Sequence, residues 1–183
     1  LHISAASDVY KRQTKAGQKC TAIRRAFVPA ALLDTVQQRL TEKLQKVVIG
    51  DPAQDGVTMG VLASVKQKHD VAAKVEQLAQ EAEIITGSHL RQDFAIQVAH
   101  PEKSAFYPPT VLLCKDPVQA QQIHHIEAFG PVVTLMPYSD LPQLATLVAR
   151  GEGSLVASIV RNHDENIEQL LSKIAPWHLS LIH

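Results

Sequence analysis

Two hydrophobic periods alternate along this chain, one typical of strands and one of helices, and their alternation restricts the fold more than any other feature. Short apolar runs predict strands at 24–29, 83–86, 111–113, 132–138 and 154–160. Between them, apolar residues recur at three- and four-residue spacing and predict helices at 31–48, 64–82, 141–150 and 165–174. Strands that alternate with helices form a sheet covered on both faces. The sequence therefore predicts an α/β fold in a three-layer arrangement, with ligand groups on the loops at the strand ends.

Residues that begin and end helices support these boundaries. Ser64 and Gln67 have the spacing of a capping box, which predicts a helix that begins at Ser64. The turn Gly50-Asp51-Pro52 follows the first helical segment, and this helix is predicted to end there because glycine and then proline are typical of helix ends. Gly87 is predicted to close the strand at 83–86.

The charge and composition of the chain exclude several classes of function. Lys plus Arg and Asp plus Glu each number 18, so no net charge attracts nucleic acid or an acidic membrane surface. No apolar run approaches the ~20 residues that span a bilayer, and no signal sequence begins the chain. Two cysteines without paired spacing suggest neither a disulfide framework nor a thiolate zinc site. We expect a cytoplasmic protein whose partner is a small molecule or another protein, with no nucleic acid and no membrane.

Cys20 stands in a basic, glycine-containing segment, Thr14-Lys15-Ala16-Gly17-Gln18-Lys19-Cys20-Thr21-Ala22-Ile23-Arg24-Arg25. Thiolate chemistry needs positive potential and access, and Lys15, Lys19, Arg24 and Arg25 supply the charge. Gly17 permits the positive backbone dihedral of a tight turn, whose free N–H groups could stabilise an oxyanion. Cys20 is therefore a candidate nucleophile, although most free cysteines are small buried side chains.

The other cysteine and the histidines are given structural interpretations. Cys114 ends an apolar run and is predicted to be a core or strand-end residue. The adjacent His124 and His125 would point apart on a strand or a helix, so they are interpreted as a polar loop before Glu127. The histidines form no persuasive ligand set, and no metal site is predicted.

Several segments together resemble the aldehyde dehydrogenase superfamily across 14–178. They are Gly17-Gln18-Lys19-Cys20, Gly50-Asp51-Pro52, Phe106-Tyr107-Pro108-Pro109-Thr110, Glu127-Ala128-Phe129-Gly130-Pro131 and Gly153-Ser154-Leu155. Within the superfamily, the sequence around Cys20 and around Glu127 is most similar to the dehydrogenase half of the bifunctional oxepin-CoA hydrolase and semialdehyde dehydrogenase of bacterial phenylacetate degradation. The resemblance implies that the α/β fold is a partial aldehyde dehydrogenase catalytic domain.

The resemblance also implies roles for three residues. Cys20 would attack an aldehyde carbonyl to give a thiohemiacetal, and water would hydrolyse the thioester that hydride transfer leaves behind. The carboxylate of Glu127 would accept hydrogen bonds from the nicotinamide ribose, and Phe129 would pack beside that ribose and ring. The implied cofactor is NADP or NAD, with NADP favoured, and the implied substrate is a CoA-linked semialdehyde. A dehydrogenase for simple aldehydes, or one that transfers the acyl group to CoA, stays open. The complete enzyme is expected to be homo-oligomeric.

The same resemblance places other parts of the machinery outside this chain. In the family, the general-base glutamate, the oxyanion asparagine and the adenine-ribose site precede the cysteine, and hence Thr14. The ring-opening, hydratase-like domain would follow His178. Residues 1–13 and 179–183 resemble translated sequencing-adapter sequence, so we expect the natural part to be 14–178. We therefore expect the isolated fragment to be inactive.

The rival interpretation is a non-catalytic α/β module in which Cys20 is structural or redox-responsive. Thiol reactivity distinguishes the two interpretations. A nucleophile of this family should be alkylated quickly below the ordinary thiol pKa of about 8.5, whereas a core thiol should resist alkylation.

Overall fold

A four-stranded sheet forms the centre of the molecule. The computed structural model describes residues 15–91, 93–98, 100, 103–160 and 168–182. The strands lie in the order β1 (Arg25–Pro29), β6 (Val132–Tyr138), β5 (Thr110–Leu113) and β3 (Glu83–Thr86). β1, β6 and β5 run parallel, whereas β3 runs antiparallel to β5. All four strands are predicted by the apolar runs, but nothing in the sequence pattern indicates their order or the reversal of β3.

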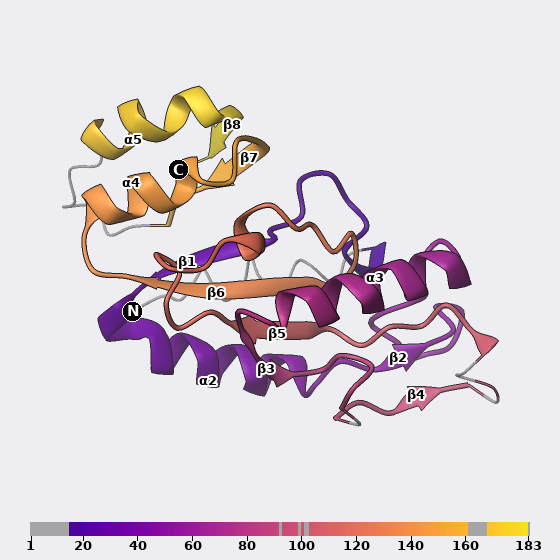
Figure 1. Ribbon diagram of the computed structural model, residues 1–183. Helices are drawn as coiled ribbons and strands as arrows, with labels where there is room; N and C mark the ends of the chain where they lie inside the picture. The colour runs from indigo at the N-terminus through magenta and orange to yellow at the C-terminus, as the bar shows by residue number, and fades with distance from the viewer. Residues whose placement is uncertain (1–14, 92, 99, 101–102, 161–167, 183) are drawn as a thin grey trace.

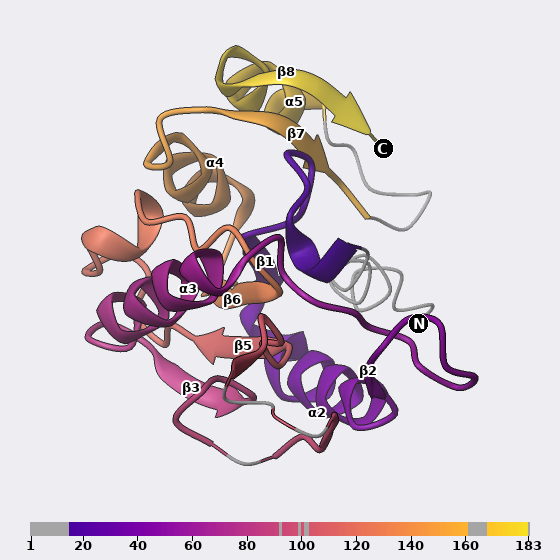
Figure 2. The ribbon, with the colours of Figure 1, turned by 90° about the vertical axis from the view of Figure 1, so that its right-hand side faces the viewer.

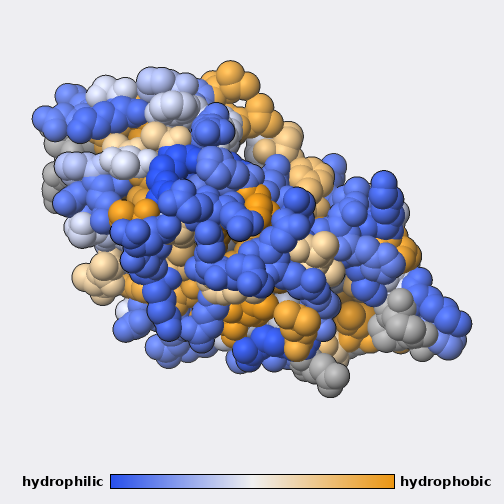
Figure 3. Space-filling model, viewed as in Figure 1, coloured by the Kyte–Doolittle hydropathy of each residue, from blue (hydrophilic) through white to orange (hydrophobic). Residues whose placement is uncertain are grey.

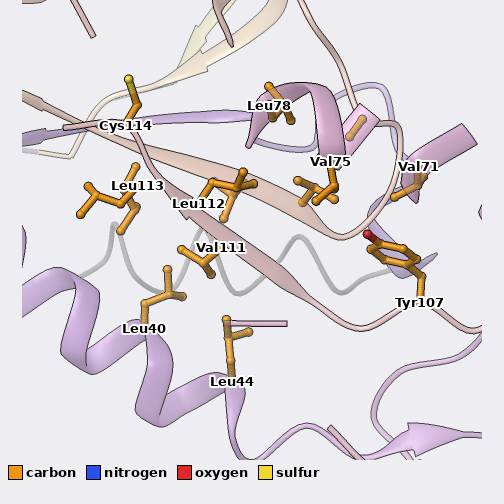
Figure 4. Packing of buried hydrophobic residues seen from close by; sticks show 14 of the residues in the cluster. Leu40, Leu44, Val71, Val75, Leu78, Tyr107, Val111, Leu112, Leu113 and Cys114 are labelled. Atoms are coloured by element: carbon orange, nitrogen blue, oxygen red, sulfur yellow. The ribbon is translucent and has the colours of Figure 1, made fainter. Parts of the chain in front are cut away.

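Helices cover both faces of this sheet, which confirms the three-layer arrangement. α2 (Leu33–Leu44) lies on one face and α3 (Val65–Leu78) on the other (Figures 1 and 2). Figure 4 shows their buried side chains on either side of β5, namely Leu40, Leu44, Val71, Val75 and Leu78. Burial of each such side chain stabilises the fold by about 1.5–3 kcal/mol. The apolar stripes of the two helices therefore build the core together with the strands.

α2 is shorter than predicted at both ends. It follows a 3-10 turn, η2 (Ala30–Leu32), and it ends at Leu44. The N–H of Val47 bonds to the carbonyl of Leu44, and β2 (Ile49–Gly50) then pairs with β4 (Ile96–Gln97). Gly50 is thus a strand residue and does not end the helix. The reason is that Val47 and Ile49 are buried and turn the chain toward the core.

α3 begins where the capping residues predict. Ser64 is its N-cap, and the hydroxyl of Ser64 accepts from the N–H of Gln67 at 3.1 Å. The side chain of Gln67 bonds to Gln18. Gly87 follows β3 with a φ of 76°, as a strand-closing glycine should, and a Cβ there would lie 1.9 Å from the carbonyl oxygen of Pro109.

The C-terminal part forms a smaller unit above the central sheet (Figure 1). α4 (Leu141–Ala149) packs on α5 (Glu168–Ile174), and β7 (Ser154–Ser158) pairs in parallel with β8 (His178–Ile182). A 3-10 turn, η5 (Ala175–Trp177), joins α5 to β8. The predicted helical residues 165–167 lie outside the described residues. That 1–13 and 179–183 are foreign to the natural protein stays a prediction.

The surface in the view of Figure 3 is largely hydrophilic, with hydrophobic groups at the top, where β7 and β8 lie in Figure 1, and others along the lower middle. Leu179 is the most exposed large apolar side chain in the described part of the chain, at 84 %. Within those same residues, no helix combines the length and the apolar character that crossing a membrane requires.

Candidate active site

The segment before Cys20 forms a tight left-handed turn. Lys15, Ala16 and Gly17 have φ angles of 53°, 49° and 73°, and the N–H of Gln18 bonds to the carbonyl of Lys15 at 3.0 Å. A left-handed conformation at a non-glycine residue costs on the order of 1–3 kcal/mol, and such strain gathers at functional sites. Two consecutive strained residues therefore mark this turn as a candidate site, which agrees with the tight turn predicted from Gly17.

Cys20 emerges from this turn with its side chain exposed. Among the residues that the structure describes, no acceptor takes the backbone N–H of Cys20. An exposed thiol beside a free backbone donor has the two features that attack on a carbonyl requires, because the donor can bind the developing oxyanion. The position of Cys20 thus permits the nucleophilic role that its sequence suggests.

Gly17 brings this turn directly onto the segment that carries Glu127 and Phe129. A Cβ at Gly17 would lie 2.2 Å from the carbonyl oxygen of Gly130 and 2.7 Å from the nitrogen of Pro131. Real Cβ atoms do not approach other atoms below 3.0 Å, so only glycine fits this contact. Two segments far apart in the sequence therefore lie backbone to backbone.

The side chain of Gln18 joins the same two segments. Its Nε2 donates to the carbonyl of Phe129 at 3.2 Å and to Oε1 of Gln67 at 3.0 Å, while its Oε1 accepts from the N–H of Ala63 at 2.7 Å. Gln18 thereby links the cysteine turn, the Phe129 backbone and the start of α3. The sequence pattern contains no signal for this role, because the three partners lie in three distant segments.

Glu127 and Phe129 alternate with buried neighbours and face solvent. Glu127 is exposed, and its carboxylate has no hydrogen bond or ion pair with any described residue. Phe129 is 39 % exposed, although an aromatic ring gains most when it is buried. A free carboxylate and an exposed ring on one short segment fit a ribose and a flat heterocycle. The carboxylate can accept hydrogen bonds from ribose hydroxyl groups, and the ring offers an apolar face to the heterocycle.

These residues lie at the amino ends of parallel strands. Cys20 precedes β1 and Glu127 precedes β6, and these two strands are neighbours in the sheet. A ligand site at the strand ends was expected, but open α/β sheets usually bind ligands at the carboxyl ends. A surface cleft of about 610 Å³ does lie at the carboxyl end of β5, where it is lined by Glu81, Glu83, Lys115 and Asp116 among others. Because that cleft is at the opposite end from Cys20, we do not assign it to the same site.

Arg24 and Arg25 donate hydrogen bonds to backbone carbonyls of other segments. Arg24 donates to the carbonyls of His125 and Gly151, each at 3.3 Å. Arg25 donates to the carbonyls of Leu147 and Val148 at the end of α4, at 2.9 and 3.1 Å. Burial, followed by the nearby charges of Arg24 and Arg150, lowers the pKa of Arg25 to about 10. Both guanidinium groups therefore bind backbone carbonyls of other segments. That they also supply positive potential to the thiol stays a prediction.

Cys114 is a core residue, as predicted. Its exposed fraction is 0 % at the end of β5, and burial raises the pKa of its thiol to about 11. A thiol with so high a pKa is a poor nucleophile at neutral pH. Cys20 is therefore the candidate nucleophile of the two.

Comparison with known proteins reveals the relationships of this chain. The model of the "Aldehyde dehydrogenase family" matches residues 4–176. The chain is 35 % identical over 175 residues to 3,4-dehydroadipyl-CoA semialdehyde dehydrogenase of Aromatoleum evansii, an alignment that covers 95 % of this chain and 34 % of that protein.

Two solved structures share the fold. 3,6-Anhydro-L-galactose dehydrogenase, solved with NADP, has a TM-score of 0.82 at 22 % identity, over 98 % of this chain and 36 % of its own. A mutant of aldehyde dehydrogenase C from Pseudomonas syringae, solved with NAD+ and octanal, has a TM-score of 0.74 at 24 % identity, over 93 % of this chain and 34 % of its own. The chain thus spans about a third of the length of the relatives that it matches. The family match over 4–176 and the 35 % identity across nearly the whole chain show that it belongs to the aldehyde dehydrogenase family.

Proposed function

We propose that this chain carries the nucleophile and part of the nicotinamide site of an NAD(P)-dependent aldehyde dehydrogenase. The single observation that carries the proposal is the contact between the Cys20 turn and the segment of Glu127 and Phe129, made by Gly17 on Gly130. It brings an exposed thiol, an exposed carboxylate and an exposed ring to the same end of the sheet. This arrangement supports the roles that the family resemblance implies for Cys20, Glu127 and Phe129.

The chemistry of the chain's own residues follows from this arrangement. The Cys20 thiolate forms a carbon–sulfur bond to the aldehyde carbon, and the backbone N–H of Cys20 binds the resulting oxyanion. NADP or NAD, held beside Glu127 and Phe129, would supply the hydride acceptor for that carbon, and Cys20 would then carry the acyl group as a thioester. Water then cleaves the thioester, so that the acid leaves and the thiol is restored. Glu127 and Phe129 hold the nicotinamide ribose and ring, as their free carboxylate and exposed ring permit.

For the substrate we propose a CoA-linked semialdehyde, in the bacterial breakdown of phenylacetate. The support is the 35 % identity to a relative named for the semialdehyde of 3,4-dehydroadipyl-CoA. For the cofactor, relatives solved with NADP and with NAD+ support either dinucleotide. We also propose that the complete enzyme is cytoplasmic, homo-oligomeric and bifunctional, and that the isolated chain is inactive because the general base lies outside it.

The decisive experiment uses the complete enzyme that contains this chain. Cys20→Ala should lower the rate of aldehyde-dependent NAD(P)H formation by about a thousandfold or more, because the covalent intermediate cannot form. The matched control is Cys114→Ala, which removes a buried thiol of similar size and should retain activity. A Cys20→Ala enzyme that keeps its activity would refute the proposal and favour the non-catalytic module.

A further inference from the structure

His124 is a fully buried imidazole held by two partners, and not part of a polar loop as its sequence suggests. Its exposed fraction is 0 %, and it lies in the 3-10 turn η4 (Gln122–His124). Its Nε2 lies 2.8 Å from the carbonyl oxygen of Pro117, and its Nδ1 lies 3.2 Å from Nη1 of Arg25. A carbonyl only accepts and a guanidinium only donates, so Nε2 carries the proton and Nδ1 accepts. Only the neutral Nε2–H tautomer satisfies both partners.

Burial and the neighbouring cationic groups oppose the protonation of His124. The charged or titratable groups that face it are Arg25 of β1, Arg150 after α4, its neighbour His125, and Glu81 after α3. The carboxylate of Glu81 acts in the opposite direction, since its charge attracts a protonated imidazole. It also accepts from the backbone N–H groups of Gln121, Gln122 and Ile123 at 2.9, 3.1 and 2.9 Å. Burial and then the charges of Arg150, Arg25 and His125 lower the pKa of His124, and the bond to the Pro117 carbonyl offsets only part of this.

Arg25 connects His124 to the nucleophile segment. It begins β1, five residues after Cys20, while His124 precedes Glu127 by three residues. The guanidinium of Arg25 also binds carbonyls near the end of α4 and lies 5.2 Å from the ring centre of Phe27, so His124 is one of several groups that set its position. In the sequence, Gln18 and Arg25 flank Cys20. Their partners, Phe129 and His124, flank Glu127.

We propose that neutral His124 is a positioning residue, which accepts from Arg25 and thereby holds the segment of Cys20 against the segment of Glu127. The proposal rests on the proposed function, because the position matters only if Cys20 acts beside Glu127. If Nδ1 of His124 were protonated, its N–H would face the N–H donor of Arg25 at 3.2 Å, and both side chains would be positively charged. Acid should therefore loosen the position of Cys20 as well as protonate its thiolate.

The test measures the alkylation rate of Cys20 by iodoacetamide between pH 5 and 8 in the folded chain. Loss of thiolate alone makes the logarithm of the rate fall with a slope of one. Protonation of His124 should steepen the slope toward two at a pH below the ordinary imidazole pKa of about 6.5. His124→Asn keeps an acceptor near the place of Nδ1 and does not titrate, so its slope should stay at one, with a rate at pH 7 close to that of the unaltered chain.

His124→Leu is the matched variant that removes the acceptor. It should lower the rate at pH 7 by about tenfold, because the half-buried guanidinium of Arg25 loses one of its partners and shifts. Circular dichroism confirms that each variant is folded. If His124→Leu does not fold, the slopes of the unaltered chain and of His124→Asn still decide the matter. A slope of one in both of these proteins would overturn the proposal.

Nitrogen-15 NMR of the histidine-labelled chain gives a readout that does not depend on Cys20. The ring of His124 should be the Nε2–H tautomer at pH 7, and a protonated or Nδ1–H ring would overturn the proposal. Failure of the proposed function is recognised separately, because it is read from turnover of the complete enzyme with Cys20→Ala. Neither the tautomer nor the pH slope requires turnover.

Discussion

Replacing Gly17 by alanine should separate the strain of the cysteine turn from its contact with the Glu127 segment. The matched control is Gly56→Ala, because Gly56 has a similar φ of 84° against 73° but no atom within 4 Å of a Cβ. Both substitutions force alanine into the left-handed region, which costs about 1–2 kcal/mol. Both also restrict the unfolded chain in the same way, so this effect cancels in the comparison.

The difference between the two variants measures the backbone contact. At Gly17 the new Cβ would lie 2.2 Å from the carbonyl oxygen of Gly130, well short of the 3.4 Å where ordinary contact begins. Relieving such an overlap in a packed site costs about 1–3 kcal/mol more. For a chain of this size, one kcal/mol lowers Tm by about 2–4 °C. We expect Gly17→Ala to melt about 2–12 °C below Gly56→Ala.

Thermal unfolding by circular dichroism and the alkylation rate of Cys20 together check this prediction. If the turn swings away from Gly130 without loss of global stability, the alkylation rate of Cys20 should change while Tm does not. Equal melting temperatures for the two variants, together with an unchanged Cys20 rate in Gly17→Ala, would refute the reasoning, because the turn would then have no close contact to lose.

Two further predictions follow from side chains that join distant segments. Gln18→Ala leaves the N–H of Ala63 and the carbonyl of Phe129 without their side-chain partner, so it should destabilise the chain by about 0.5–1.5 kcal/mol and alter the Cys20 alkylation rate. An unchanged Tm and rate would contradict this role. Burial alone would raise the pKa of Glu81, but bonds from the N–H groups of Ile123, Gln121 and Gln122 outweigh it and lower that pKa. The stabilisation by Glu81 is therefore present above the unfolded carboxyl pKa of about 4.3 and is lost as the pH falls through the pKa of Glu81 in the folded chain. Urea unfolding should show a smaller loss of stability in acid for Glu81→Gln than for the unaltered chain. Equal losses in the two proteins would refute the assignment.

Local features of this protein could be predicted because their causes lie within a few residues. The hydroxyl of Ser64 accepts from Gln67 three positions away, and the apolar stripe of α3 needs only its own spacing. Cys114 lies in a continuous apolar run, which indicated its burial. The exposure of Cys20 also agrees with its basic, glycine-containing turn, although Arg24 and Arg25 proved to bind carbonyls elsewhere.

Features that depend on distant partners could not be predicted in this way. Gly50 follows a helical segment in the sequence and was predicted to end that helix, but it pairs with β4 and is a strand residue. His124 had polar neighbours in sequence, yet the carbonyl of Pro117 and the side chain of Arg25 allow it to be buried without loss of hydrogen bonds. The antiparallel direction of β3 depends equally on its partner β5.

The sequence by itself predicted the alternation of strands and helices, the positive φ at Gly17 and Cys20 as the candidate nucleophile. These follow from hydrophobic period, backbone freedom and side-chain chemistry, which are properties of short segments. Only the tertiary structure decided that Gln18 meets Phe129 across 111 positions, and that Glu127 comes to the same end of the sheet as Cys20. The physical reason is that β1 and β6 pair in parallel, and parallel pairing carries the loops before both strands to one edge.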